Sequence, residues 1–193
     1  MIKSISFSQE EILQSIVALH TGPIQADVTF GGGCFYKNGA PRPEFCFDLM
    51  PRKPGVIAAD VCHLPLKDDC LQSVMFDPPF MLKTGPGSIL KERFSHGLGT
   101  MQDLWNFYFR AMDQIFHVLL PSGWLIFKCQ DGVLSGVNHF THVAVHDVAL
   151  HLGFTAVDLF ILLAKNRMGD PQGRAQKHAR KFHSYFWVFR KGR

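Results

Sequence analysis

Apolar runs alternate along the chain with stretches of helical spacing, and the first four runs each end at a glycine or an acidic residue. Short apolar runs bounded by such residues predict buried strands, here at 24–30, 45–49, 56–59, 71–76, 124–129, 155–163 and 184–190. Apolar residues three or four apart predict helices at 10–20, 101–120 and 137–152, the first of them capped by Ser8. This alternation favours an α/β fold, with a largely parallel sheet covered by helices on both faces, in a single domain over residues 1–193.

The most informative motif is the tetrapeptide Asp77-Pro78-Pro79-Phe80, which directly follows the apolar run 71–76. The two prolines end the strand because neither can donate a ladder hydrogen bond. We therefore expect a rigid, extended turn that carries one acceptor side chain, backbone carbonyls and an aromatic face. Ligands of open α/β sheets bind at the carboxyl ends of strands, so this turn is a candidate site.

A glycine turn and two further acids end the first three predicted strands. Residues 27–33 have the form D-x-x-x-G-x-G, and glycines there allow a tight turn and close approach of the backbone to a ligand. Asp48 follows Gly31 by 17 residues, near the roughly 20-residue spacing at which an acid reaches a ribose hydroxyl in dinucleotide-binding folds. Asp60 stands where a carboxylate can accept from an adenine amino group. Taken alone, the glycine turn is equally compatible with an ordinary α/β domain.

Together, the glycine turn, the two acids and Asp-Pro-Pro-Phe resemble the class I S-adenosylmethionine-dependent amino-methyltransferases. The motifs cover residues 27–80, and the pattern of strands and helices extends the likeness to Arg190. The resemblance implies a Rossmann-like fold with a seven-stranded, mostly parallel sheet, an antiparallel last strand and helices on both faces. It also implies S-adenosyl-L-methionine as the cofactor. The implied catalytic residues hold an amino group on the carboxylate and on the first proline's carbonyl, with the ring stacked on its planar system: Asp77, Pro78, Pro79 and Phe80.

By the same resemblance, the glycine turn and its acid lie beside the methionine moiety, the second acid at the ribose and the third at the adenine. The implied cofactor-binding residues are Asp27, Thr29, Gly31, Gly33, Phe35, Asp48, Asp60 and Val61. One feature departs from the family, which usually has a full helix between the glycine turn and the second strand. Residues 34–44 contain Asn38-Gly39, Pro41 and Pro43, which disfavour a helix. We expect a loop carrying Phe35 and Tyr36 in its place.

Basic residues are concentrated near the C-terminus, where 6 of the 20 lie between Lys165 and Lys181 against a single acid, Asp170. If the strand at 155–163 is parallel, this loop emerges at the edge that carries Asp77, where it would suit a phosphate backbone. The loop at 81–100 is also basic and glycine-containing, which suggests a substrate lid or plain disorder. The predicted nucleic-acid-binding residues are Lys83, Arg93, Lys165, Arg167, Arg174, Lys177, His178, Arg180 and Lys181. A solvated charged loop is the alternative.

These features favour a methyltransferase acting on an exocyclic amine of a nucleic-acid base. DNA is favoured over RNA, with adenine-N6 or cytosine-N4 as the target, while guanine-N2 or adenine-N6 of RNA is the close alternative. A non-catalytic nucleic-acid-binding module with a Rossmann-like fold is the contrasting hypothesis. On duplex nucleic acid the target base would have to be flipped out. No separate target-recognition domain is apparent, so we expect weak specificity, a homodimer or a separate specificity partner.

The composition indicates the class of protein and the compartment in which we expect it. The chain is 47% hydrophobic with a net charge of +4, as expected of a globular protein. The five cysteines form no C-x-x-C pair and no secretory pattern precedes them, so we expect reduced thiols in the cytoplasm. No apolar run is long enough to span a bilayer, and no membrane partner is expected. His139, His142 and His146 have a spacing that would place them on one helix face, which we interpret as a half-exposed face and not as a metal site.

Overall fold

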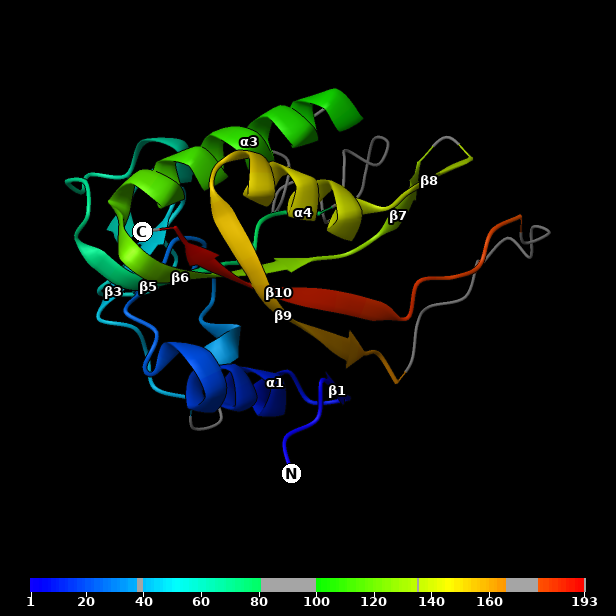
Figure 1. Cartoon of the computed structure of the whole chain (residues 1–193), viewed down its shortest axis with the longest axis horizontal. Coiled ribbons are helices and arrows are strands. Elements are labelled where there is room, and N and C mark those ends of the chain that lie inside the picture. Colours follow the sequence, from blue (N-terminus) through cyan, green and yellow to red (C-terminus); the bar gives the residue numbers. More distant parts are fainter. Residues whose placement is uncertain (38–39, 81–99, 135, 166–176, 193) are drawn as a thin grey trace.

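The computed structural model describes residues 1–37, 40–80, 100–134, 136–165 and 177–192, and its centre is an eight-stranded sheet in the order β1-β9-β10-β6-β5-β2-β3-β4 (Figure 1). A separate two-stranded hairpin is formed by β7 and β8. The strands are β1 Ile5–Ser6, β2 Ala26–Asp27, β3 Phe45–Asp48, β4 Ile57–Ala58, β5 Leu71–Phe76, β6 Leu119–Cys129, β7 Gly132–Leu134, β8 Val137–His139, β9 Phe154–Leu163 and β10 His183–Lys191.

The strand directions confirm a mostly parallel sheet with an antiparallel last strand. β5 pairs in parallel with β2 and β6, and β3 pairs in parallel with β2 and β4. β10 is antiparallel to both of its neighbours, β6 and β9. The strands β2, β3, β4, β5, β6 and β9 therefore present their carboxyl ends at one edge. The sheet has one strand more than predicted, because the two residues of β1 pair in parallel with β9 and are too few to produce a period-2 pattern.

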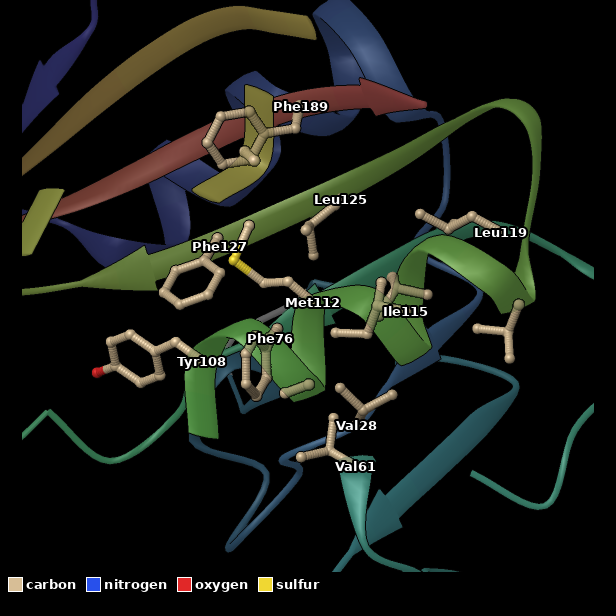
Figure 2. Packing of buried hydrophobic residues seen from close by; sticks show 14 of the residues in the cluster. Val28, Val61, Phe76, Tyr108, Met112, Ile115, Leu119, Leu125, Phe127 and Phe189 are labelled. Atoms are coloured by element: carbon tan, nitrogen blue, oxygen red, sulfur yellow. The ribbon is translucent and has the colours of Figure 1, made fainter. Parts of the chain in front are cut away.

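Helices cover both faces of the sheet, as predicted. Figure 1 shows α1 (Gln9–Ile16) on one face and α3 (Met101–Val118) with α4 (Thr141–His151) on the other. The Ser8 hydroxyl caps α1 by accepting from the Glu11 N–H. Under α3, buried residues of the helix meet β5 and β6 in the main core (Figure 2), including Phe76, Tyr108, Met112, Ile115 and Phe127. A smaller core lies under α1 and reaches Met75, Ile126 and Phe186 of the sheet. No described helix is long and apolar enough to cross a bilayer.

Two predicted helices have wrong boundaries. The helix predicted over 101–120 ends at Val118, and β6 already begins at Leu119, which pairs with Leu71. Pro121, Ser122 and Gly123 therefore lie within β6, where the register shifts and Ser122 has φ of 63°. A Cβ on Gly123 would lie 2.8 Å from the Leu120 carbonyl oxygen, so this irregularity needs glycine.

The helix predicted over 137–152 begins only at Thr141, because Val137–His139 forms β8 and pairs with β7. Gly136 has φ of +78° and Val137 is exposed, as in a hairpin turn. His139 consequently lies on a strand, so the prediction that it shares a helix face with His142 and His146 is wrong.

Candidate active site

The Asp-Pro-Pro-Phe turn lies at the carboxyl end of β5 and is held from two sides. The Asp77 N–H donates to the Thr29 hydroxyl at 2.8 Å, which fixes the start of the turn to the chain after β2. The Tyr108 hydroxyl donates to the Pro79 carbonyl at 2.9 Å, which fixes its other end to α3. Tyr108 is itself packed among aromatic rings of the main core, edge-on to Phe127. The turn is therefore anchored to the most buried part of the molecule.

The Asp77 carboxylate has two differently placed oxygens. Its Oδ2 lies 3.2 Å from Nζ of Lys128, near the end of β6. Its Oδ1 is buried and has no hydrogen-bond partner among the described residues. Burial raises the pKa of Asp77, and the Lys128 ammonium opposes that rise. A buried acceptor without a partner is costly, so Oδ1 is the natural position for a donor supplied by a ligand.

The glycine turn after β2 is bonded to the end of β3. The Gly31 N–H donates to Oδ2 of Asp48 at 2.8 Å, while Oδ1 of Asp48 accepts from the Met50 N–H. Gly31 has φ of +54°, and a Cβ there would meet nothing closer than 3.8 Å, so the backbone is open to close approach. Gly33 differs, since at φ of +66° its Cβ would lie 2.8 Å from the Phe30 ring. Glycine is therefore needed at position 33 because of packing within the turn.

Asp27 is fully buried at the end of β2. Its Oδ1 accepts from the Thr29 N–H at 2.9 Å and its Oδ2 from the Tyr36 hydroxyl at 2.8 Å. Burial nevertheless raises the pKa of Asp27 to about 7, and Asp77 and Asp48 add to the rise. In this arrangement the Asp27 carboxylate could act on a ligand only indirectly, through the Thr29 and Tyr36 groups that bond to it.

The described part of the segment after the glycine turn contains no α-helix, as the prolines and Asn-Gly predict. Within the described residues 34–37 and 40–44 it forms one 3-10 turn, Cys34–Tyr36. The Tyr36 ring stacks on Phe30 at 5.6 Å, and the Phe35 ring packs edge-on against Phe186 at 6.3 Å. The predicted loop carrying these two rings is confirmed, while its contact with a cofactor remains a prediction.

The third acid lies farther along the same edge. Asp60 caps the 3-10 turn Val61–His63 by accepting from the Cys62 N–H, and its side chain is 45% exposed. Val61 is buried and points toward Val28 in the main core (Figure 2). An exposed carboxylate above an apolar residue suits recognition of an amino-bearing ring, and that role also remains a prediction.

Two contributors to the site are absent from the predicted site residues: Tyr108 and Lys128. At the end of the predicted strand 124–129, contact of Lys128 with a substrate and plain termination of the strand are equally compatible with the sequence. Lys128 is opposite Asp77 because β5 and β6 pair in parallel with Phe76 beside Phe127, so the next residues of both strands face the same edge. The patterns of the two strands place both of these ends at one edge but do not fix the register that brings Lys128 to Asp77. Tyr108 lies within the helix predicted over 101–120, and no signal in the sequence indicates that its hydroxyl reaches Pro79.

The predicted nucleic-acid-binding residues fall into two groups. Four of them lie outside the described residues: Lys83, Arg93, Arg167 and Arg174. The others lie between β9 and β10, at the sheet edge that also carries Asp77. The His178 ring bonds to the Gly136 carbonyl and to Asn138, which ties this segment to the β7–β8 hairpin. The Lys181 ammonium lies 6.0 Å from the centre of the Phe140 ring. Lys165, Lys177 and Arg180 are exposed.

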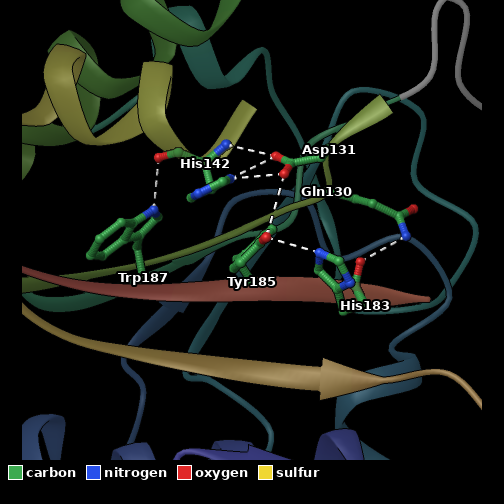
Figure 3. Close-up of polar contacts among 6 residues, drawn as sticks. All are labelled: Gln130, Asp131, His142, His183, Tyr185 and Trp187. Carbon is green, nitrogen blue, oxygen red and sulfur yellow. Dashed lines mark hydrogen bonds and ion pairs between the residues drawn. The ribbon is translucent and has the colours of Figure 1, made fainter. Parts of the chain in front are cut away.

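A polar cluster joins α4 to the sheet beside this hairpin (Figure 3). Both oxygens of buried Asp131 contact Nδ1 of His142, at 2.8 and 3.0 Å, and the His142 ring stacks on Tyr185 at 4.2 Å. The Trp187 indole donates to the His142 carbonyl at 3.0 Å, and the Tyr185 hydroxyl bonds to His183. These contacts occupy His142 in orienting the start of α4.

Comparison with known proteins places the fold. No model of a known protein family and no curated protein matches the sequence. Among solved structures, the N-methyltransferase NodS from Bradyrhizobium japonicum is 13% identical and has a TM-score of 0.55, covering 96% of this chain and 94% of NodS. TrmN from Thermus thermophilus is 14% identical, with a TM-score of 0.53, over 94% of this chain and 48% of TrmN. The cytosine-N4-specific PvuII DNA methyltransferase is 16% identical, with a TM-score of 0.48, over 65% of this chain and 44% of that protein.

The chain therefore has the class I methyltransferase fold that its motifs predict. The order of strands, the antiparallel β10 and the helices on both faces all agree with that fold. The chain spans about half the length of the first structures that it matches. Its substrate and partners are consequently matters for proposal.

Proposed function

We propose that this protein transfers a methyl group from S-adenosyl-L-methionine to an exocyclic amine of a nucleic-acid base, with DNA adenine-N6 as the favoured target. The observation that carries the proposal is the buried Oδ1 of Asp77, which has no partner in the part of the chain that the structure describes and lies within an anchored Asp-Pro-Pro-Phe turn. Such a turn offers a fixed acceptor to an N–H donor and a ring, Phe80, to a planar group. The fold shared with a SAM-dependent methyltransferase from Thermotoga maritima supports this cofactor, and ligands of such sheets bind at the carboxyl ends of the strands.

The residues at that edge fit the cofactor in part. Open space above Gly31, the neighbouring Asp48 and the half-exposed Asp60 suit a nucleoside with ribose hydroxyls and an adenine amino group. Asp27 is covered by Tyr36, so it would act on a bound methionine moiety through that hydroxyl or after its displacement. When bound, the cofactor supplies an electrophilic methyl group on a sulfonium.

The protein's own contribution is orientation and charge. The exocyclic amine of a base is a weak nucleophile because its lone pair is delocalised into the ring. The two N–H groups of the amine would donate hydrogen bonds to the Asp77 carboxylate and to the Pro78 carbonyl. These bonds would favour a tetrahedral nitrogen with its lone pair directed at the methyl group. The carboxylate would also stabilise the positive charge that develops on that nitrogen. Phe80 would hold the plane of the base by stacking.

The direct test is transfer of labelled methyl from S-adenosyl-L-methionine to separate pools of unmethylated DNA and total RNA, followed by mass analysis of nucleosides. We expect N6-methyladenine from the DNA pool. Label confined to RNA would replace the DNA target with the RNA alternative. Salt-sensitive binding of nucleic acid, with no label and no cofactor binding by calorimetry, would identify a binding module instead.

The basic segment before β10 provides a second test. Replacing Lys177, Arg180 and Lys181 with alanine should weaken DNA binding at low salt and lower the slope of log affinity against log salt by up to about 3, because each phosphate contact contributes about 0.9. The matched control removes the same charge elsewhere, with alanine at exposed Lys3, Lys67 and Arg110. Equal slopes for the two triple variants would remove this segment from the interface.

A further inference from the structure

Lys128 has a more specific place in the site than the end of a strand requires. Its ammonium lies 3.2 Å from Oδ2 of Asp77, 4.9 Å from the centre of the Phe35 ring and 5.7 Å from that of Phe186. These partners come from the turn after β5, from the 3-10 turn after the glycines and from β10. The side chain is only 12% exposed. A cation placed over two aromatic faces and against one carboxylate oxygen has a defined position.

Only one oxygen of the Asp77 carboxylate has a hydrogen-bond partner among the described residues, which indicates that its ion pair with Lys128 has a functional role. A pair that served stability alone would be expected to satisfy both oxygens, because a buried charge with an open hydrogen-bond position is costly. Here Lys128 binds Oδ2, and Oδ1 is buried without a partner among the described residues. The cation thus decides which oxygen is left for a ligand.

We propose that Lys128 is a positioning residue of the transfer site: it keeps Asp77 as an anion and turns Oδ1 toward the amino group of the substrate. The inference rests on the proposed function. A protonated acid would present an O–H, which would meet an N–H of the amine donor to donor. An anion accepts through both oxygens, one on Lys128 and one on the substrate. It also repels a carboxylate substrate, and its free oxygen suits an N–H donor such as an amine.

Burial and Lys128 have opposite effects on the pKa of Asp77. Burial raises the pKa of Asp77, and the Lys128 charge and hydrogen bond both lower it. Removing the cation leaves burial unopposed, so the pKa of Asp77 rises further. The transfer rate requires the anion, so it is lost as the pH falls through that pKa. In Lys128→Met the loss must then begin at a higher pH than in the wild type.

The experiment combines a pH profile with a direct titration. We expect kcat/KM of Lys128→Met on labelled DNA to fall about tenfold or more at pH 7 and to recover as the pH is raised. Lys128→Arg, which keeps the charge, should retain the wild-type profile. Exposed Lys67→Met is the matched control. The ¹³C resonance of the Asp77 carboxyl, assigned with Asp77→Asn, should titrate at higher pH in Lys128→Met, whether or not transfer occurs.

The two readouts separate the two proposals. An unchanged Asp77 titration and an unchanged pH profile in Lys128→Met would overturn the role of Lys128. A shifted titration without transfer by the wild type to any nucleic acid would count against the proposed function and would support the ion pair's control of Asp77. Circular dichroism and thermal melts confirm that the variants are folded.

Discussion

Asp77→Ala is expected to lower kcat for methyl transfer by about 100-fold or more while leaving the affinity for S-adenosyl-L-methionine nearly unchanged. Removing one preorganised group that stabilises developing charge costs about two to three orders of magnitude in rate. Asp77 contacts Thr29 only through its backbone N–H, and that contact survives the substitution. Steady-state transfer assays and calorimetry with the cofactor measure the two quantities.

Asp77→Asn should be almost as defective, for a reason particular to this site. An asparagine has one oxygen, and the Lys128 ammonium, a donor without acceptor capacity, would attract it. The amide N–H₂ would then occupy the position of Oδ1 and face the donor of the substrate. Asp68→Ala, an exposed acid before the amino end of β5, provides the matched control. Normal transfer by either Asp77 variant would refute the mechanism.

The sequence predicts the fold and the main acid of this site because both depend on local patterns. The run 71–76 is continuous and apolar, it ends at two prolines, and β5 has those same bounds. The site is less predictable where it depends on register between distant segments. Lys128 meets Asp77 because Phe76 of β5 pairs with Phe127 of β6, and the pattern within each strand does not fix which residues of the two strands pair.

The predicted start of the helix at 137–152 is wrong for a similar reason. Val137 fits the helical spacing of apolar residues that continues into α4, but pairing of β8 with β7 overrides that periodicity. The hydrogen bond from His178 to the Gly136 carbonyl connects this hairpin to a segment some 40 residues later. Contacts of that range are invisible to a window of local spacing, so the histidine face on a single helix could not be corrected from the sequence.

The largest expected effect on stability concerns Asp27. In the unfolded chain its pKa is the ordinary value of 3.8, and burial raises it to about 7 in the folded protein. The folded state therefore holds a proton that the unfolded state has lost between these values. The unfolding free energy should fall as the pH rises through this window, by up to about 4 kcal/mol for this group at 1.36 kcal/mol per pH unit.

Asp27→Asn removes this titration while preserving much of the geometry. The amide oxygen can accept from the Thr29 N–H, and the amide N–H₂ can donate to the Tyr36 hydroxyl. Urea denaturation from pH 4 to pH 8 should show the variant gaining stability relative to the wild type, with the difference growing by up to about 4 kcal/mol. Taking the difference removes the contributions of groups that titrate alike in both proteins.

Tyr36→Phe tests the same acid from the other direction. The Tyr36 hydroxyl donates to Oδ2 of Asp27 and lowers its pKa against the effect of burial, so losing that donor should extend the decline in stability to higher pH. A difference between wild type and Asp27→Asn that stays constant with pH would show that Asp27 is ionised at low cost. The negative charge of Asp77 contributes to the raised pKa of Asp27, so below about pH 7 a mostly neutral Asp27 spares the Asp77 carboxylate a second buried negative charge nearby.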